Sequence, residues 1–209
     1  MTLRETIGAV HNKGVAVKQK IKALVSQESR LERINRRNRS LLEAKEALGR
    51  HPFTMYDTTN ADSTLPTDHP EAVAGYVGGN WSTYARLVAR FPNAKHLSIA
   101  VNAGELAQCL DVETGDATPA EAPGWVIRER GRLYKLGRKP WVYANASTMP
   151  AVKQALDRAG INRADYHLWV ADYDGIAQIP AGFDAKQYES VERGSLDYDA
   201  SVVRAGLLA

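Results

Sequence analysis

The sequence predicts an α/β fold in which five strand–helix units and three further strands close a barrel, preceded by a long N-terminal α-helix. Three observations carry this prediction. Residues 15–48 contain no Pro or Gly and repeat apolar residues every seven positions. Short β-rich runs then alternate with helix-like stretches, which indicates parallel strands with helices outside them. After residue 160 the runs are separated by loops too short for good helices.

Composition sets the first limits on function. No apolar run approaches the length of a membrane-spanning helix, and the N-terminus lacks the basic-then-apolar pattern of a secretory signal. We therefore expect accumulation in a cytoplasm with release by another route, or a place in a virion. The single cysteine, Cys109, excludes an intramolecular disulfide. It stands in an apolar run, which favours a buried structural thiol over a nucleophile.

Charge divides the chain into two predicted domains. Residues 1–50 contain twelve Lys and Arg and five Glu, a net charge of +7. Residues 51–209 contain 15 basic and 19 acidic residues, a net charge of −4. This asymmetry predicts a basic helical arm, 1–50, and a separate barrel domain, 51–209.

The arm has the pattern of an imperfect coiled coil. Its two apolar rows, which fit heptad a and d positions, are Val10, Val17, Leu24 and Leu31, and Ile34, Leu41 and Leu48. Three interpretations stay open for residues 10–48: a helix lying against the barrel, a coiled coil for self-association or docking to a larger assembly, and a tether for an anionic polymer. The run "RINRRNR" is strongly basic but has no interleaved aromatic residues, so nucleic acid is an unlikely partner.

The barrel domain follows in order along the chain. The predicted strands cover residues 53–57, 72–77, 96–101, 107–113, 140–145, 166–174, 183–189 and 195–201. The predicted helices cover 81–91, 119–136 with Pro119 in the first turn, and 149–159, ended by Gly160.

A barrel like that of triosephosphate isomerase is favoured over an open sheet by the residues at the strand ends. Polar or aromatic groups that could bind or react end nearly every run, namely Asp57, Tyr76, Glu113, Tyr143, Asp172, Gln187 and Asp199. In a barrel all these ends converge on one face, whereas in an open sheet only those at the switch point would meet.

Two carboxylates stand at the end of the fourth run. Asp111 and Glu113 are two residues apart, so on a strand they share a face. Neighbouring carboxylates raise one another's pKa, and a raised Glu pKa suits a general acid at neutral pH. Paired carboxylates beside a cleft are typical of glycoside hydrolysis. The alternative is a solvated acidic loop, "DVETGD", turned by Gly115.

These residues resemble a known family, the family 25 glycoside hydrolases, which are muramidase-type lysozymes. The resemblance covers about residues 53–205 and is carried by "MYDTTN", the Asp-x-Glu of "LDVE", "LWVADYD", "DAKQYES" and "LDYDAS". Lys186 stands where the family has Trp, and Asp199 where it has Asn. "GDATPAEAPGWV" also resembles endolysin or virion-associated domains of bacteriophages that infect actinobacteria.

The resemblance implies a peptidoglycan hydrolase with bacterial cell wall as its partner. It implies Glu113 as the general acid, Asp111 as a residue that holds charge or positions the N-acetyl group, and Asp57 and Asp197 as the rest of an acidic floor. Substrate-binding candidates are Tyr76, Tyr143, Trp169, Asp172, Gln187, Tyr188 and Asp199. The other reading is a barrel that binds glycan or builds a phage particle without cleaving anything.

Other chemistries lack their motifs. There is no Gly-x-Ser-x-Gly elbow, phosphate-binding loop or dinucleotide fingerprint. The five histidines include no His-Glu-x-x-His, so a metal centre is not predicted. The expected hydrolysis needs no cofactor.

Overall fold

The computed structural model describes residue 30, residues 33–39 and residues 51–208. The chain divides into two units, residues 1–49 and 50–209. In the first unit, residues 33–39 are helical and exposed. Most of the heptad pattern over 10–48 lies outside the described residues, so self-association and docking through the arm stay predictions. Within the described residues, no helix has the length and apolarity needed to span a membrane.

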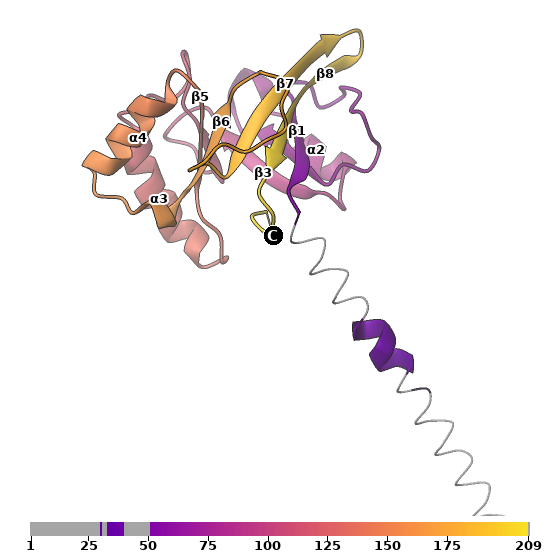
Figure 1. Cartoon of the computed structure of the whole chain (residues 1–209). Coiled ribbons are helices and arrows are strands. Elements are labelled where there is room, and N and C mark those ends of the chain that lie inside the picture. Colours follow the sequence, from indigo (N-terminus) through magenta and orange to yellow (C-terminus); the bar gives the residue numbers. More distant parts are fainter. Residues whose placement is uncertain (1–29, 31–32, 40–50, 209) are drawn as a thin grey trace, which may run out of the picture. The chain divides into compact units, whose positions relative to one another are not determined.

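The second unit is a closed eight-stranded barrel, which confirms the predicted barrel (Figure 1). The strands are β1 (Phe53–Asp57), β2 (Ala72–Tyr76), β3 (Lys95–Ala100), β4 (Cys109–Asp111), β5 (Trp141–Asn145), β6 (His167–Ala171), β7 (Ala185–Arg193) and β8 (Leu196–Val203). Strands β1 to β7 run parallel, and β8 closes the barrel antiparallel to both β7 and β1. A tight turn at Gly194, with φ of 64°, joins β7 to β8, so a hairpin replaces the crossover that a parallel strand would need.

Three α-helices lie between strands in residues 51–208, fewer than five strand–helix units would supply. They are α2 (Tyr84–Arg90), α3 (Ala122–Tyr134) and α4 (Met149–Arg158), with short 3₁₀ turns η1 (Gly79–Trp81) and η2 (Arg163–Asp165). The β1–β2, β3–β4 and β6–β7 connections, all described, contain no α-helix. Figure 1 shows α3 and α4 together on one side of the barrel.

The start of α3 differs from its predicted position. The helix begins at Ala122 with Pro123 in its first turn, and Pro119 lies outside it. The cause is a local turn: the backbone N–H and the hydroxyl of Thr118 both donate to the Glu121 carboxylate, at 2.8 and 2.7 Å. The carbonyl oxygen of Thr118 also accepts from the Glu121 N–H at 3.0 Å, so residues 118–121 form a turn that leads into the helix.

Alternation along each strand decides which side chains enter the barrel. Met55, Cys109, Tyr143 and Ala185 belong to the buried cluster that fills the interior, and Cys109 is a buried free thiol as predicted. Since side chains two apart share a face, the next inward positions on β1, β4 and β7 are Asp57, Asp111 and Gln187. A second cluster, which includes Leu110, Trp125 and Leu156, packs the outer face of the sheet under α3 and α4.

Candidate active site

Carboxylates from three strands gather at one rim of the barrel. Asp57 ends β1 and Asp111 ends β4, while Glu113 follows two residues after Asp111. Asp199 enters from the antiparallel β8, where it is the Cα partner of Asp57. The charges of Asp111, Glu113 and Asp199 all raise the pKa of Asp57, so the four carboxyl groups form one electrostatic group, called here the acidic cluster.

Gln187 holds one half of the acidic cluster together. Its Nε2 donates to Asp57 Oδ1 and Oδ2, at 3.0 and 3.1 Å, and lies 3.1 Å from Asp199 Oδ2. Its Oε1 accepts from the hydroxyls of Tyr143 and Tyr173, at 2.6 and 2.7 Å. Gln187 is 1 % exposed, so this network is a buried one in which each partner constrains the others.

Burial makes the Asp57–Asp199 pair reluctant to ionise. Burial, then the neighbouring Asp199 carboxylate, raises the pKa of Asp57 well above its usual value, and the Gln187 amide opposes the shift. Burial also raises the pKa of Asp199, while hydrogen bonds from Ser190 and Tyr173 lower it. Two close carboxylates of this kind lose their protons in two coupled steps.

Asp111 is the carboxyl with the clearest shift. Burial, then the charges of Glu113 and Asp116, raises the pKa of Asp111 to about 8, and a hydrogen bond from Tyr76 opposes the shift. Its Oδ1 is buried and has no hydrogen-bond partner among the described residues. Asp111 is therefore protonated at neutral pH and leaves one oxygen for a further partner.

Glu113 differs from Asp111 in being partly open to solvent. Burial raises its pKa, Asn145 hydrogen bonds lower it, and Asp116 raises it again. Asn145 ends β5, and its own Oδ1 accepts from Ser147 and Thr148, which fixes the amide. A half-buried acid with a raised pKa and a fixed neighbour suits proton transfer to a bound molecule.

The aromatic candidates separate into buried and open groups. Tyr143 is 6 % exposed and packs edge-on against Trp169, with ring centroids 4.6 Å apart. Trp169 is 1 % exposed and its Nε1 donates to Ser201 Oγ at 3.0 Å, so the structure places it inside the barrel rather than on a surface that a sugar can reach. Tyr76 lies beside the exposed Trp81, with ring centroids 6.5 Å apart.

The other predicted site residues lie apart from the hydrogen-bonded cluster. The backbone of Asp197 donates to Ser63 Oγ and accepts from Thr58 Oγ1. Asp172 is half exposed and lies 3.8 Å from Lys186 Nζ. Tyr188 is near Tyr56 and Tyr198, a pair packed edge to face on the outer side of β1 and β8. The charge of Asp197 raises the pKa of Asp199, and the roles of these three side chains in binding or catalysis stay predictions.

Lys186, at the family's Trp position, has a structural contact instead. Its side chain is 4 % exposed and its Nζ donates to Asp174 Oδ1 at 2.6 Å. This ion pair, buried on the Lys186 side and exposed at Asp174, ties β7 to the β6–β7 loop, which also carries Tyr173. The loop is thereby anchored next to the acidic cluster.

Sequence reasoning missed four residues that the fold brings to the rim: Trp81, Asn145, Tyr173 and Asp116. Asn145 and Tyr173 each stand within two residues of a strand end, so the rule that selected Asp57 could have found them. Trp81 stands in η1, where no strand pattern points to it. Among the residues that the structure describes, no group of three or more His, Cys, Asp and Glu side chains could hold a metal ion.

Comparisons with known proteins find similarity in structure but not in sequence. No family model matches the sequence. No curated protein matches it either. Among solved structures, the chain is similar to a muramidase from Acremonium alcalophilum, with a TM-score of 0.46 and 12 % identity over 73 % of this chain and 93 % of that one. It is also similar to a Tat-secreted protein of Mycobacterium tuberculosis crystallised with HEPES, with a TM-score of 0.42 and 10 % identity over 75 % of this chain and 98 % of that one.

Proposed function

We propose that this chain is a glycoside hydrolase that cleaves the glycan strands of bacterial peptidoglycan, as a lysozyme does. The observation that carries the proposal is the acidic cluster: Asp57, Asp111, Glu113 and Asp199 meet at one barrel rim with raised pKa values. Carboxyl groups that hold protons near neutral pH beside others that ionise are what acid-catalysed cleavage of a glycosidic bond requires.

Glu113 is the general acid in this proposal. Glu113 and Asp199 are the partly exposed members of the four, whereas Asp57 and Asp111 are buried, so a substrate oxygen can approach Glu113. It donates its proton to the glycosidic oxygen while the bond between that oxygen and the anomeric carbon breaks, and the bonding electrons leave with the departing sugar. Water then adds to the anomeric carbon and returns a proton to Glu113. The negative charge that the Asp57–Asp199 pair carries after its first proton loss stabilises the cationic transition state.

Asp111 is assigned to positioning. With a pKa of about 8 it is neutral at working pH, so its carboxyl can donate a hydrogen bond. Its buried Oδ1, without a partner among the described residues, is a polar atom that a substrate group would satisfy. The carbonyl oxygen of an N-acetyl group accepts such a bond, which favours amino sugars over plain hexoses.

Two open aromatic side chains supply surface for a sugar chain. Trp81 is 46 % exposed and Tyr173 is 54 % exposed, and each lies next to a residue of the site, Tyr76 and Gln187 respectively. Aromatic faces of this kind pack against the apolar faces of sugars. We assign both to substrate binding.

One observation favours the second candidate, a barrel that binds glycan without cleaving it. Asp57 and Asp111 are only 4 % and 3 % exposed, and Asp57 is engaged by Gln187. A substrate reaches them only through Glu113 and the rim. In that case the chain would bind cell walls and leave their glycan intact.

The test uses the full chain on purified cell walls, with muropeptide analysis of the released material. The parent should solubilise walls and create new reducing ends. Glu113→Gln should still bind walls but lose about 10²–10⁴-fold in rate, because an amide cannot donate the proton. Glu71→Gln, at an exposed site before β2, is the matched control and should keep the parent rate. Wall binding by the parent without new reducing ends would select the second candidate.

A further inference from the structure

A second concave site lies at the opposite end of the barrel. It is lined by residues that begin or precede strands: Lys95 begins β3, Gln108 precedes β4, and His167 begins β6. The carboxylates of the proposed active site stand at the other ends of the strands. The cavity, called here the basal pocket, has a volume of about 460 Å³, within the range of small-molecule sites.

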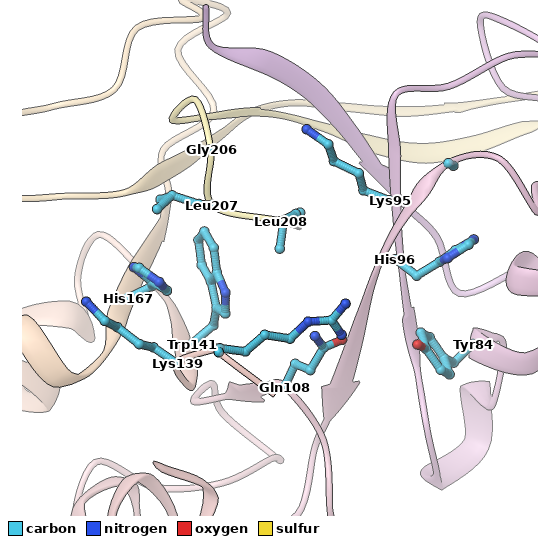
Figure 2. A pocket seen from close by; sticks show the side chains of 13 residues that line it. Tyr84, Lys95, His96, Gln108, Lys139, Trp141, His167, Gly206, Leu207 and Leu208 are labelled. Carbon is cyan, nitrogen blue, oxygen red and sulfur yellow. The ribbon is translucent and has the colours of Figure 1, made fainter. Parts of the chain in front are cut away.

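The lining of the basal pocket is basic. Its basic members are Lys95, His96, Arg138, Lys139 and His167, and none of its described lining residues is Asp or Glu. These side chains come from separate segments of the chain that meet only in the folded barrel. Figure 2 shows Lys139 and His167 on one side of the cavity, with Lys95 and His96 across from them. Convergent positive charge in a concavity attracts an anion.

Several donors in the basal pocket have no acceptor among the described residues. The Lys139 ammonium makes no hydrogen bond or ion pair within that part of the chain. Lys95 Nζ lies 4.0 Å from the centre of the Phe53 ring, a contact that positions the ammonium but accepts none of its protons. His96 is committed, since its Nε2 lies 2.9 Å from Phe91 O.

The ring of His167 is fixed by contacts that involve its Nδ1, which leaves its Nε2 for a ligand. Its Nδ1 lies 3.5 Å from Asp184 Oδ2, and its ring packs on Trp141 at 4.6 Å between centroids. Asp184 also accepts from Arg163 at 2.6 Å, so its charge is shared outside the pocket. The Nε2 of His167 is therefore a positioned hydrogen-bonding group on a fixed ring.

We propose that the basal pocket binds a phosphate ester of the size of a sugar phosphate or polyol phosphate. Lys95, Lys139 and His167 contact the phosphate oxygens, and Gln108 with Tyr84 contacts the hydroxyl groups of the ester. Lysine is a point-charge binder of phosphate, and charged donors give the stronger hydrogen bonds. The site is separate from the acidic cluster, and this proposal does not depend on the proposed function.

Calorimetry on the full chain tests the proposal, with inorganic phosphate, glycerol 3-phosphate and glycerophosphoglycerol as probes and sodium chloride at equal ionic strength as the blank. We expect saturable one-site binding of glycerol 3-phosphate or glycerophosphoglycerol above the blank. Tighter binding of glycerol 3-phosphate identifies a free monoester as the ligand class. Tighter binding of glycerophosphoglycerol identifies the diester unit of a polymer. No saturable heat with any probe would overturn the proposal.

Variants place the binding in the basal pocket. Lys139→Gln should raise the dissociation constant about tenfold, the loss expected for one charge-assisted hydrogen bond, and Lys95→Gln with Lys139→Gln should raise it further. Arg158→Gln removes an exposed positive charge in the last turn of α4 and should change the dissociation constant less than about twofold. Lys139 is exposed, so its variant should keep the parent's circular dichroism and melting temperature. If Lys139→Gln and Arg158→Gln weaken binding of the phosphate ester equally, the binding reflects the overall positive charge of the chain, and the proposed site is wrong.

Discussion

Asp57 and Asp199 face each other across the seam that closes the barrel, as Cα partners of the antiparallel β1–β8 pair. The same amide nitrogen, Nε2 of Gln187, lies 3.0 Å from Asp57 Oδ1 and 3.1 Å from Asp199 Oδ2. Two acids thus share one donor in a buried place. Their ionisation, the stability of the seam and the proposed catalysis are consequently linked through Gln187.

Replacing the shared donor should destabilise the barrel in a pH-dependent way. Gln187→Met keeps the side-chain volume but leaves Asp57 without its amide, at a cost of about 2–4 kcal/mol in the free energy of unfolding. The amide lowers the pKa of Asp57, so its loss raises that pKa further and ionisation becomes costlier. The loss should therefore be larger at pH 8 than at pH 5 in urea unfolding. Gln154→Met, exposed on α4, is the control; losses of equal size at both pH values would contradict the linkage.

Asp111 should make the folded chain less stable as pH rises. Its folded pKa of about 8 exceeds the ordinary 3.8, so the folded state binds more protons than the unfolded state between these values. The stability that Asp111 contributes is then fully present below about pH 4 and is lost as pH rises towards 8. Asp111→Asn should match the parent near pH 4 and exceed it at pH 8 by about 5 kcal/mol. Asp68→Asn, on an exposed loop, should follow the parent curve; an Asp111→Asn curve parallel to the parent would refute the shift.

The rate of wall hydrolysis should follow a bell-shaped pH profile with its maximum on the acid side of neutral. The alkaline limb reflects Glu113 losing its proton, and burial places this limb above the usual range of a glutamate. The acid limb reflects the first of the two coupled steps of Asp57 and Asp199. Measurement of kcat/KM from about pH 3 to 9 shows both limbs. Residual activity of Glu113→Gln should lack the alkaline limb, and an unchanged limb would assign it to another group.

Trp81 should contribute to affinity rather than to the chemical step. Trp81→Ala removes a half-exposed ring beside Tyr76, and we expect KM to rise about 3- to 10-fold with kcat nearly unchanged. Tyr134→Ala removes an aromatic ring that is 80 % exposed on α3, away from the site, and should leave both constants as they are. A fall in kcat alone for Trp81→Ala would indicate a role in positioning Tyr76.

The basic arm should govern attraction to anionic walls and not the chemistry. Residues 51–209 should fold without residues 1–50, because the barrel closes through pairs among its own strands. Removal of the +7 arm should flatten the salt dependence of wall binding and leave the pH profile unchanged. Light scattering on both forms tests self-association through residues 10–48. A shifted pH profile in the shortened chain would mean that the arm acts at the active site.

The choice between Asp197 and Asp199 on β8 shows a limit of prediction from sequence. Asp197 and Asp199 are two apart on β8 and share a face, so alternation treats them alike. The resemblance to the muramidase family favoured Asp197 as the catalytic group. In the structure the β1–β8 register puts Asp199 opposite Asp57 and pairs Asp197 with Glu192 of the hairpin. Register between strands far apart in the chain is set by the whole barrel, and no local pattern encodes it.

The aromatic residues show the same boundary. Trp169 stands in the middle of β6, in the run "LWVADYD", and its aromatic ring made it a candidate for sugar stacking. It fills the interior against Tyr143 instead, while the exposed rings at the rim are Trp81, from a short turn, and Tyr173, from a loop. Composition identifies which residues have rings, but only packing decides which rings are covered.

By itself the sequence determined the strand order, the helices near 84–90 and 149–158, the buried thiol of Cys109 and the acids at the ends of β1 and β4. These follow from periodicity and local preference, which act over a few residues. Only the tertiary structure decided that Gln187 bridges Asp57 and Asp199, that Asp111 holds a proton near neutral pH, and that basic side chains converge at the opposite end of the barrel. The reason is that hydrogen bonds, burial and charge pairing between distant segments depend on distances that exist only once the barrel has closed.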